Sequence, residues 1–355
     1  MNSASASLIP VTVLTGFLGS GKTTILNHLL HQPGMDGVVA IINEFGEVGL
    51  DHLLVETSEE RFALLDNGCV CCSVRQDLVA LLGDLASRET RGEIPAIRRI
   101  LIETTGLADP VPVLHTLMTA PVVVARFRID GVVVTVDAVN AAGSLDNHAE
   151  ASRQVAAADR ILLTKADLVD DVALAEVGRR IALINPTAAV LRVDHGRVAL
   201  DTILEAGLFT PSHQVEQVTS WFSSAVRATA ANSNAASHER QFNCTGGISS
   251  FSLIVQEPIR WSAFQRWLDY VAALKGDELL RFKALVNVTD RLQGPVVVHA
   301  VQHVIHPPIT LDGWPSDDRS SRLVFIVRDI PMEAIERTLA RFGGVSRDSI
   351  ARPAA

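Results

Sequence analysis

Residues 11–30 read VTVLTGFLGSGKTTILNHLL, and this stretch decides the fold. Its segment 16–23 fits the phosphate-loop pattern G-x-x-x-x-G-K-[ST], with an apolar β-branched run before it and helical spacing after it. Glycines such as Gly16, Gly19 and Gly21 let backbone N–H groups turn towards phosphate oxygens, and the following helix presents its positive end to the same anion. The sequence therefore predicts a P-loop between a strand and a helix.

The polar side chains of this loop have separate predicted roles. Lys22 would reach the β- and γ-phosphates, and Thr23 would bind Mg²⁺ through its hydroxyl group. Ser20 and Thr24 stand beside them and are assigned to the same phosphate site. The structural alternative is a glycine-rich turn with a solvated lysine, which leaves the matching flanks on both sides unexplained.

Short apolar runs without polar alternation recur over the first two thirds of the chain, each followed by a turn and a segment with helical spacing. This alternation predicts an α/β domain over residues 1–222, with a P-loop NTPase parallel sheet and helices on both faces. The long apolar stretch Pro121–Val139 is interrupted by charged residues and is expected in the sheet core. The expected strands are Val11–Thr15, Val38–Ile42, Arg99–Ile102, Gly131–Val136, Arg160–Leu163 and Val190–Val193.

The remaining third has a different composition. Residues 223–243 are rich in Ser, Ala and Asn without apolar periodicity, and they are predicted to form a linker. A smaller α+β domain with two layers is expected over residues 244–355, with helices on one face of a sheet. Its expected elements are strands at 247–256, 280–287, 296–305 and 323–328 and helices at 261–274 and 332–342.

Composition excludes several classes of function. The chain has 355 residues, 48% of them hydrophobic, and a formal net charge of −9, so no positive field would gather nucleic acid or anionic lipid. No run of about 20 nearly uninterrupted apolar residues is present, so a membrane span is not expected. The N-terminus lacks the basic start and apolar block of a secretory signal, which indicates a cytoplasmic protein.

Two further motifs follow predicted strands. The run 164–167 reads TKAD where P-loop GTPases carry Asn-Lys-x-Asp, and it assigns Thr164, Lys165 and Asp167 to the base. The Asp167 carboxylate would accept two hydrogen bonds from guanine that adenine does not offer, which predicts GTP as the nucleotide. Thr164 replaces the usual asparagine, so one supporting hydrogen bond is weaker or differently placed. An ordinary exposed turn is the alternative.

Glu103 ends another predicted strand and is followed by Thr104-Thr105-Gly106. The carboxyl end of a parallel strand is where ligands of such sheets gather. Glu103 is therefore assigned to the Mg²⁺ ion or the water next to it, and Gly106 to the γ-phosphate through its backbone N–H. The alternative is a strand-end turn with Glu103 in solvent.

Three of the four cysteines, Cys69, Cys71 and Cys72, lie in the segment NGCVCC. In an extended segment Cys69 and Cys71 point to the same side, and a turn at Cys72 would bring round the third sulfur. Thiolates favour Zn²⁺, Cu(I) or other late transition ions over Mg²⁺, and an open fourth position would suit metal transfer. Buried inert cysteines and a redox sensor are the alternatives.

An acidic segment, INEFGEVGLD at 42–51, lies between the P-loop and the thiols. Its carboxylates and glycines suit a segment that is ordered by the γ-phosphate and Mg²⁺. Glu44 is assigned to the transition-metal site, Glu47 to orientation of the attacking water and Asp51 to Mg²⁺, although an ordinary acidic loop explains any one of them equally well.

Taken in order, GFLGSGKTT, INEFGEVGLD, NGCVCC, ETTGLADP and TKAD closely resemble the CobW family of P-loop GTPases, which is related to the metal-centre assembly GTPases UreG and HypB. LLRFKALV, VQHVIHPP and RLVFIVRDI resemble the CobW C-terminal domain. The resemblance implies a GTP-hydrolysing metallochaperone that binds Zn²⁺ or Co²⁺ at the three cysteines and delivers it to a client metalloenzyme. The His-rich linker of some members is absent, because the linker holds only His238.

Several questions stay open at the level of sequence. His299, His303 and His306 are interpreted as edge-strand or interface residues, and Cys244 has no assigned role. A homodimer is compatible with the sequence, which does not identify the client or the metal used in the cell. A small-molecule P-loop kinase and a metal- or thiol-redox sensor with a structural nucleotide are the alternative functions. The kinase leaves TKAD and the cysteines unexplained.

Overall fold

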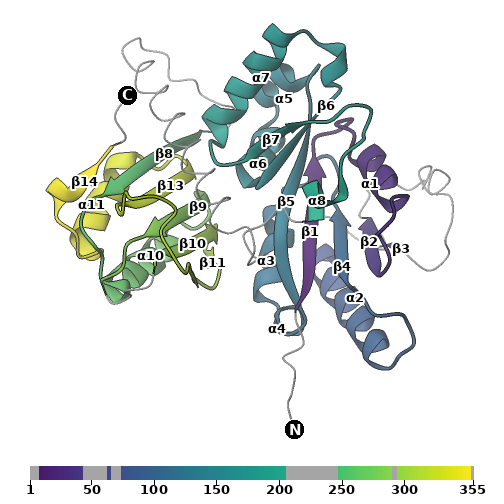
Figure 1. Cartoon of the computed structure of the whole chain (residues 1–355), viewed down its shortest axis with the longest axis horizontal. Helices are drawn as coiled ribbons and strands as arrows, with labels where there is room; N and C mark the ends of the chain where they lie inside the picture. The colour runs from purple at the N-terminus through teal and green to yellow at the C-terminus, as the bar shows by residue number, and fades with distance from the viewer. Residues whose placement is uncertain (1–7, 43–61, 65–72, 205–246, 290–293, 353–355) are drawn as a thin grey trace. The chain divides into compact units, whose positions relative to one another are not determined.

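The computed structural model describes residues 8–42, 62–64, 73–204, 247–289 and 294–352. The chain divides into two compact units (Figure 1). The first comprises Met1–Asn140, Ala158–Asp170 and Val190–Gly207, and the second comprises Ala141–Ala157, Asp171–Ala189 and Leu208–Ala355. The predicted linker at 223–243 lies outside the described residues. Within the described ranges, every helix is too short or too polar to cross a membrane.

The first sheet has seven strands in the order β3-β2-β4-β1-β5-β6-β7. Its strands β1, β2, β4, β5 and β6 are joined in parallel pairs, and β3 pairs in parallel with β2. The register places Leu14, Ile42 and Glu103 at one level, near the carboxyl edge of the sheet. The strands are β1 (Ile9–Gly16), β2 (Val38–Ile42), β3 (Phe62–Leu64), β4 (Arg99–Glu103), β5 (Phe127–Asp137), β6 (Arg160–Thr164) and β7 (Ala189–Arg192).

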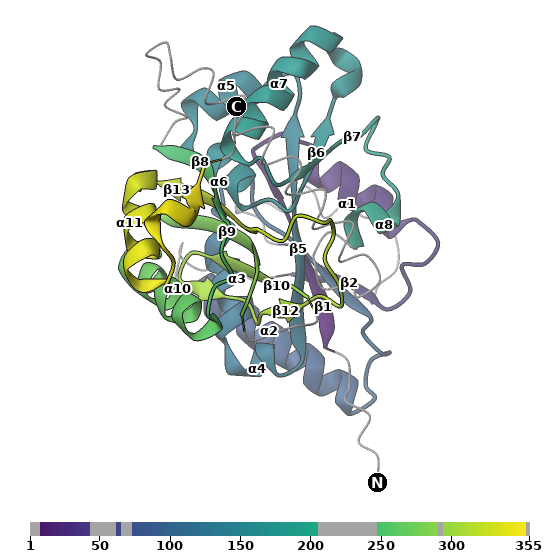
Figure 2. The same ribbon diagram turned by 60° about the vertical axis from the view of Figure 1, so that its left-hand side comes forward.

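Helices cover both faces of this sheet, which confirms the predicted α/β fold. Helices α1 (Lys22–Leu30) and α8 (Leu200–Leu204) bury apolar side chains against Leu14, Leu101 and Val133. Helices α3 (Val111–Thr119) and α4 (Pro121–Val124) pack on β5 from the other side, and α2 (Ser73–Thr90) packs against both of them (Figures 1 and 2).

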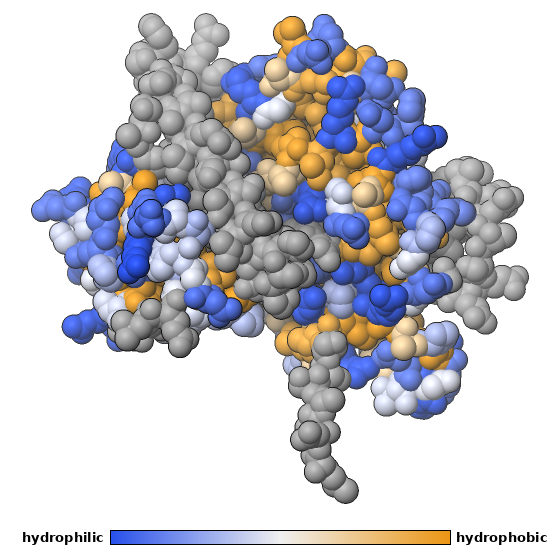
Figure 3. Space-filling view, in the orientation of Figure 1, coloured by the Kyte–Doolittle hydropathy of each residue, from blue (hydrophilic) through white to orange (hydrophobic). Residues whose placement is uncertain are grey.

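Two local expectations for the first sheet were incomplete. The three-residue strand β3 has too short an apolar run to be recognised as a strand in the sequence. The stretch 121–139 is not sheet throughout, because Pro121 stands in the first turn of α4, where its fixed φ favours a helix start. Val122 and Val124 of α4 are 55% and 43% exposed, and Figure 3 shows an apolar area where α4 lies in Figure 1.

The second sheet is antiparallel and has seven strands. Its main path runs β11-β10-β9-β13-β8-β14, with β12 paired to β10. Helices α10 (Trp261–Lys275) and α11 (Met332–Phe342) cover one face around a core that contains Phe264, Trp267, Phe282 and Phe325. This arrangement confirms the predicted two-layer α+β domain. The strands are β8 (Ile248–Val255), β9 (Leu279–Val286), β10 (Val296–Val301), β11 (Val304–Ile305), β12 (Ile309–Thr310), β13 (Ser321–Arg328) and β14 (Ile350–Ala351).

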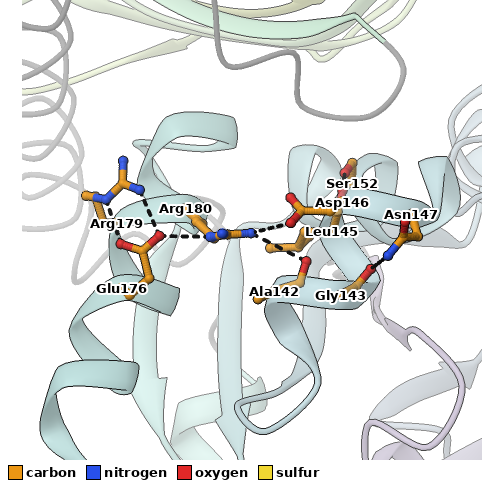
Figure 4. A network of polar contacts seen from close by, with 9 residues as sticks. All are labelled: Ala142, Gly143, Leu145, Asp146, Asn147, Ser152, Glu176, Arg179 and Arg180. Carbon is orange, nitrogen blue, oxygen red and sulfur yellow. Dashed lines mark hydrogen bonds and ion pairs between the residues drawn. The ribbon is translucent and has the colours of Figure 1, made fainter. Parts of the chain in front are cut away.

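Three helices of the N-terminal half, α5 (Ala141–Asn147), α6 (Ala149–Ala157) and α7 (Asp171–Ile184), belong to the same unit as this sheet. Arg180 on α7 joins Asp146 on α5 at 2.7 Å and Glu176 at 2.9 Å (Figure 4). Hydrogen bonds from Arg179 and Arg180 lower the pKa of Glu176 to about 2.

The second sheet also bonds the ends of two of these helices. Arg281 Nη1 on β9 donates to the Ala157 carbonyl at 2.9 Å, and Ser250 Oγ on β8 donates to the Leu183 carbonyl at 2.8 Å. Carbonyl groups in the last turn of a helix have no partner within the helix, so these two side chains satisfy groups that burial would otherwise leave unpaired.

Candidate nucleotide-binding site

The loop between β1 and α1 has the backbone that a phosphate cradle requires. Gly16 has φ +150, and a Cβ there would lie 2.2 Å from Thr135 Oγ1 and 2.5 Å from the Thr135 carbonyl oxygen. Gly21 has φ +91 and stands directly before α1, with no side chain to bond the first amides of the helix. Ser20 is buried, and its Oγ lies 2.6 Å from Thr135 Oγ1. The loop is therefore fixed by β5, and the free end of α1 faces it.

Lys22 is buried at the first position of α1. Its Nζ donates to the carbonyl oxygens of Gly16 at 2.9 Å and Phe17 at 3.3 Å, so the ammonium lies across the loop. A cation held over the loop, together with the N-terminal end of α1, gives the loop a positive potential, which is the electrostatic requirement for a phosphate group. The contact of Lys22 with the β- and γ-phosphates stays a prediction, and it requires a cation at this place.

Thr23 and Glu103 are brought together from α1 and β4. Thr23 Oγ1 donates to Glu103 Oε1 at 2.9 Å, and Glu103 is buried. A hydroxyl and a carboxylate side by side are hard oxygen ligands of the kind that Mg²⁺ accepts, so these two residues fit the ion. The solvent-facing turn considered for Glu103 is excluded by its burial.

The segment after β4 lies directly against the P-loop. A Cβ on Gly106 would lie 2.9 Å from both the backbone N and the Cα of Leu18. The close approach of two backbones explains why a residue without a side chain stands at position 106. The structure thus places Gly106 beside the loop, as its predicted contact with the γ-phosphate requires.

The TKAD motif, which is predicted to bind the base, begins at the carboxyl end of β6. Thr164 is buried, and its Oγ1 donates to the Ser20 carbonyl at 2.8 Å and to the Val136 carbonyl at 3.2 Å. The hydroxyl that replaces the usual asparagine therefore ties β6 to the P-loop and to β5. Asp167 is exposed at the start of a short 3-10 helix, Ala166–Leu168, where its carboxylate is accessible to a base.

Asp137, at the end of β5, was missed in the sequence. Its carboxylate pairs with Lys165 Nζ at 2.7 Å and accepts from Asn140 Nδ2 at 2.8 Å and the Val139 N–H at 2.9 Å. Lys165 has φ 54, a left-handed conformation that is uncommon for residues other than glycine. An aspartate directly after the predicted strand 131–136 was the available signal.

Partial burial by itself would raise the pKa of Asp137. The hydrogen bonds with Lys165, Asn140 and Val139 lower this pKa by more than burial raises it, so the pKa of Asp137 lies below its ordinary value.

This depressed pKa predicts a pH-dependent contribution to stability. Because the folded-state pKa lies below the ordinary value, the contribution is present above the unfolded pKa, about 4, and is lost as the pH falls through the folded pKa. We expect Asp137→Asn to lower the free energy of unfolding at pH 7, and we expect the difference from wild type to shrink in acid. Urea unfolding at pH 7 and at acidic pH measures this difference in the free energy of unfolding. A difference that grows in acid would contradict the lowered pKa of Asp137.

Several predicted site residues lie outside the described ranges: Glu44, Glu47, Asp51, Cys69, Cys71 and Cys72. Cys244, which has no assigned role, lies outside them as well. Among the residues that are described, no group of three or more His, Cys, Asp or Glu side chains could hold a metal ion.

The histidines of the second domain are distributed around a hairpin. The strand expected at 296–305 turns back at Gln302, which has φ 50, and His303 lies in this turn. The His306 N–H donates to the His299 carbonyl at 2.9 Å. His299 is buried on β10 beside Lys283 of β9, so it does not lie on an edge strand as expected. Burial and the charges of Lys283 and Arg281 hold its pKa well below normal.

Comparisons with known proteins agree with this geometry. Residues 10–192 match the family described as CobW/HypB/UreG, nucleotide-binding domain, and residues 248–343 match the cobalamin synthesis protein cobW C-terminal domain. The zinc chaperone YjiA of Escherichia coli is 32% identical over 332 residues, which cover 94% of this chain and 98% of that protein. The zinc chaperone CobW of Pseudomonas aeruginosa is 33% identical over 228 residues, or 55% of this chain and 59% of that one. The crystal structure of Zn(II)-bound YjiA GTPase from E. coli has a TM-score of 0.68 and 28% identity, covering 96% of this chain and 99% of that one.

Proposed function

Because the chain belongs to the CobW family of P-loop GTPases, we propose that it is a GTP-hydrolysing metallochaperone that transfers Zn²⁺, or Co²⁺, to a client metalloenzyme in a nucleotide-dependent way. The metal would be the cargo and would bind at Cys69, Cys71 and Cys72, with Glu44 as a candidate fourth ligand. Two relatives, YjiA and CobW, are zinc chaperones, which favours Zn²⁺ over Co²⁺.

The observation that supports this proposal most directly is the position of the end of β3 relative to Glu103. Leu64 at the end of β3 is level with Ile42 of β2, and Ile42 is level with Glu103 of β4. Neighbouring strands lie about 4.8 Å apart, so the backbone at Leu64 is roughly 10 Å from that of Glu103. The cysteines stand between this strand end and the start of α2 at Ser73. The chain that carries the thiols therefore departs from the same sheet edge as the phosphate site.

The described residues would divide the work on GTP as follows. Lys22 and the loop amides would hold the phosphates and neutralise the charge that develops on them during transfer to water. Thr23 and Glu103 would hold Mg²⁺, which supplies further neutralisation when bound. Asp167 would recognise guanine, with Asp137 holding Lys165 beside it. Glu47 remains the candidate for orienting the attacking water and Asp51 a candidate for the Mg²⁺ site.

Metal and nucleotide would affect each other through the acidic segment 42–51, which lies between the end of β2 and β3 in the chain. If GTP changes the affinity for Zn²⁺, linkage requires Zn²⁺ to change the affinity for GTP by the same factor, typically about 5–150-fold. Competition with a chromophoric chelator, in the presence of a non-hydrolysable GTP analogue or of GDP, measures the first factor. Equal Zn²⁺ affinities in the two nucleotide states would remove the transfer proposal.

The thiol assignment has its own test. We expect Cys71→Ala to abolish stoichiometric Zn²⁺ binding and to leave GDP affinity nearly intact, because the phosphate and base sites are built from other elements. Cys244→Ala is the matched control and should keep Zn²⁺ binding. Retention of stoichiometric Zn²⁺ by Cys71→Ala, measured by metal analysis after gel filtration, would refute the thiol site.

Two further measurements separate the alternative functions. A small-molecule kinase would yield a phosphorylated product by mass spectrometry, whereas the proposed function releases inorganic phosphate. A sensor with a structural nucleotide would show almost no multiple turnover of GTP even with metal and client present.

A further inference from the structure

The outer helices of the second domain carry an exposed aromatic cluster. Tyr270 and Leu274 stand one turn apart on α10 and are 40% and 60% exposed, and Phe342 at the end of α11 is 40% exposed. The rings of Tyr270 and Phe342 pack with centroids 4.9 Å apart, and the Arg341 guanidinium carbon lies 5.3 Å from the Phe342 centroid. Figures 1 and 2 both show α10 and α11 side by side.

Positive charge surrounds this cluster. Arg266 precedes Tyr270 by one turn on α10, and Arg337 precedes Arg341 by one turn on α11. In the part of the chain that the structure describes, these three arginines make no salt bridge, although the charge of Arg337 helps to lower the pKa of Glu333, and Arg352 binds the α11 carboxylates Glu333 and Glu336. Asp269 is the exposed carboxylate on α10. We call Tyr270, Leu274, Phe342, Arg266, Arg337 and Arg341 the aromatic–arginine surface.

Local charge and composition indicate what this surface would bind. Tyr, Phe and Arg are enriched at the centres of protein interfaces, where they contribute much of the binding energy. The chain as a whole carries −9, so an acidic partner is repelled by most of the molecule and attracted at this surface. Such complementarity would orient the partner as it arrives.

Two other occupants fit less well. A second copy of the chain placed on this surface by two-fold symmetry would bring arginines against arginines, which is unfavourable. A nucleic acid would need many phosphate contacts, typically about 6–10, and three arginines around an apolar centre do not supply them. We therefore propose that the aromatic–arginine surface docks an acidic protein segment that carries apolar side chains.

The experiment uses the fact that Tyr270 is the chain's single tyrosine. Full-length protein labelled with 3-fluorotyrosine gives one ¹⁹F resonance, which reports on this surface. The probe is a synthetic helical peptide of Glu, Leu and one Trp, and the matched control peptide has Lys in place of Glu. We expect the acidic peptide to shift the resonance saturably and the basic peptide to leave it in place. The probe carries no metal, so the result is independent of the metal-transfer proposal.

Variants locate the binding. Arg341→Glu and Leu274→Ser should each weaken the acidic peptide by about tenfold. Arg319→Glu makes the same charge change at an exposed position between β12 and β13, and it should leave the affinity within about twofold. Thermal unfolding checks that all three variants are folded.

Three outcomes would overturn the proposal. The first is equal binding of the two peptides, or equal loss of affinity in Arg319→Glu and Arg341→Glu. The second is an equal ¹⁹F shift with oligothymidine, which would indicate a nucleic-acid surface. The third is a dimer by light scattering that Leu274→Ser converts to monomer, which would indicate that a second copy occupies the surface.

Discussion

Replacing Lys22 with alanine is expected to lower GTP turnover by about 10²–10³-fold, the usual cost of removing one preorganised group that stabilises transition-state charge. The Lys22 ammonium already lies across the loop, bonded to the Gly16 and Phe17 carbonyls, so little reorganisation is needed when a triphosphate enters. Alanine removes the cation but keeps the backbone of α1, because alanine is the best helix former. The loss should therefore fall on chemistry and phosphate binding rather than on the fold.

Single-turnover hydrolysis is the appropriate measurement, because unaided P-loop GTPases turn over at only about 10⁻⁴ to 10⁻² s⁻¹. Lys275→Ala, which removes an exposed lysine from α10, is the control and should turn over GTP at the wild-type rate. If folded Lys22→Ala retained a rate within about twofold of wild type, the phosphate role of this residue would be wrong.

The sequence was sufficient for the parts of the site that are local in the chain. A strand, a glycine-rich turn and a helix stand next to one another in residues 11–30, so the loop that positions Lys22 depends on neighbouring residues alone. The placing of Glu103 beside Thr23 needed one further step, the rule that parallel strands end at one edge.

Contacts between residues far apart in the chain could not be predicted from the sequence. Thr164 Oγ1 reaches the Ser20 carbonyl across 144 positions, and Arg281 reaches the Ala157 carbonyl across 124. Neither the hydrophobic pattern nor the spacing of motifs in the sequence indicates which distant residues form a hydrogen bond. For the same reason the sequence did not group α5, α6 and α7 with the second sheet, and it treated Thr164 as a loss relative to asparagine when its hydroxyl bonds the P-loop.

If Asp167 reads the base, Asp167→Asn is expected to weaken GTP binding by about 10²–10⁴-fold, because hydrogen bonds to a charged group contribute about 1.5–3 kcal/mol each. In the variant the bond to guanine N1–H loses its charge, and the amide N–H faces the 2-amino group donor to donor. Xanthine has a carbonyl oxygen where guanine has the 2-amino group. An asparagine amide can donate to that oxygen and accept from N1–H, so the variant should bind XTP more tightly than wild type does.

Equilibrium binding of labelled GTP and XTP to both proteins measures this exchange of preference. The exchange separates base recognition from a general loss of affinity, because damage to the fold or the P-loop would weaken both triphosphates together. Asp171→Asn, at an exposed carboxylate in the first turn of α7, is the matched control and should leave both affinities unchanged. Parallel losses for GTP and XTP in Asp167→Asn would mean that another residue reads the base, although Asp167 is exposed in the 3-10 helix that follows β6.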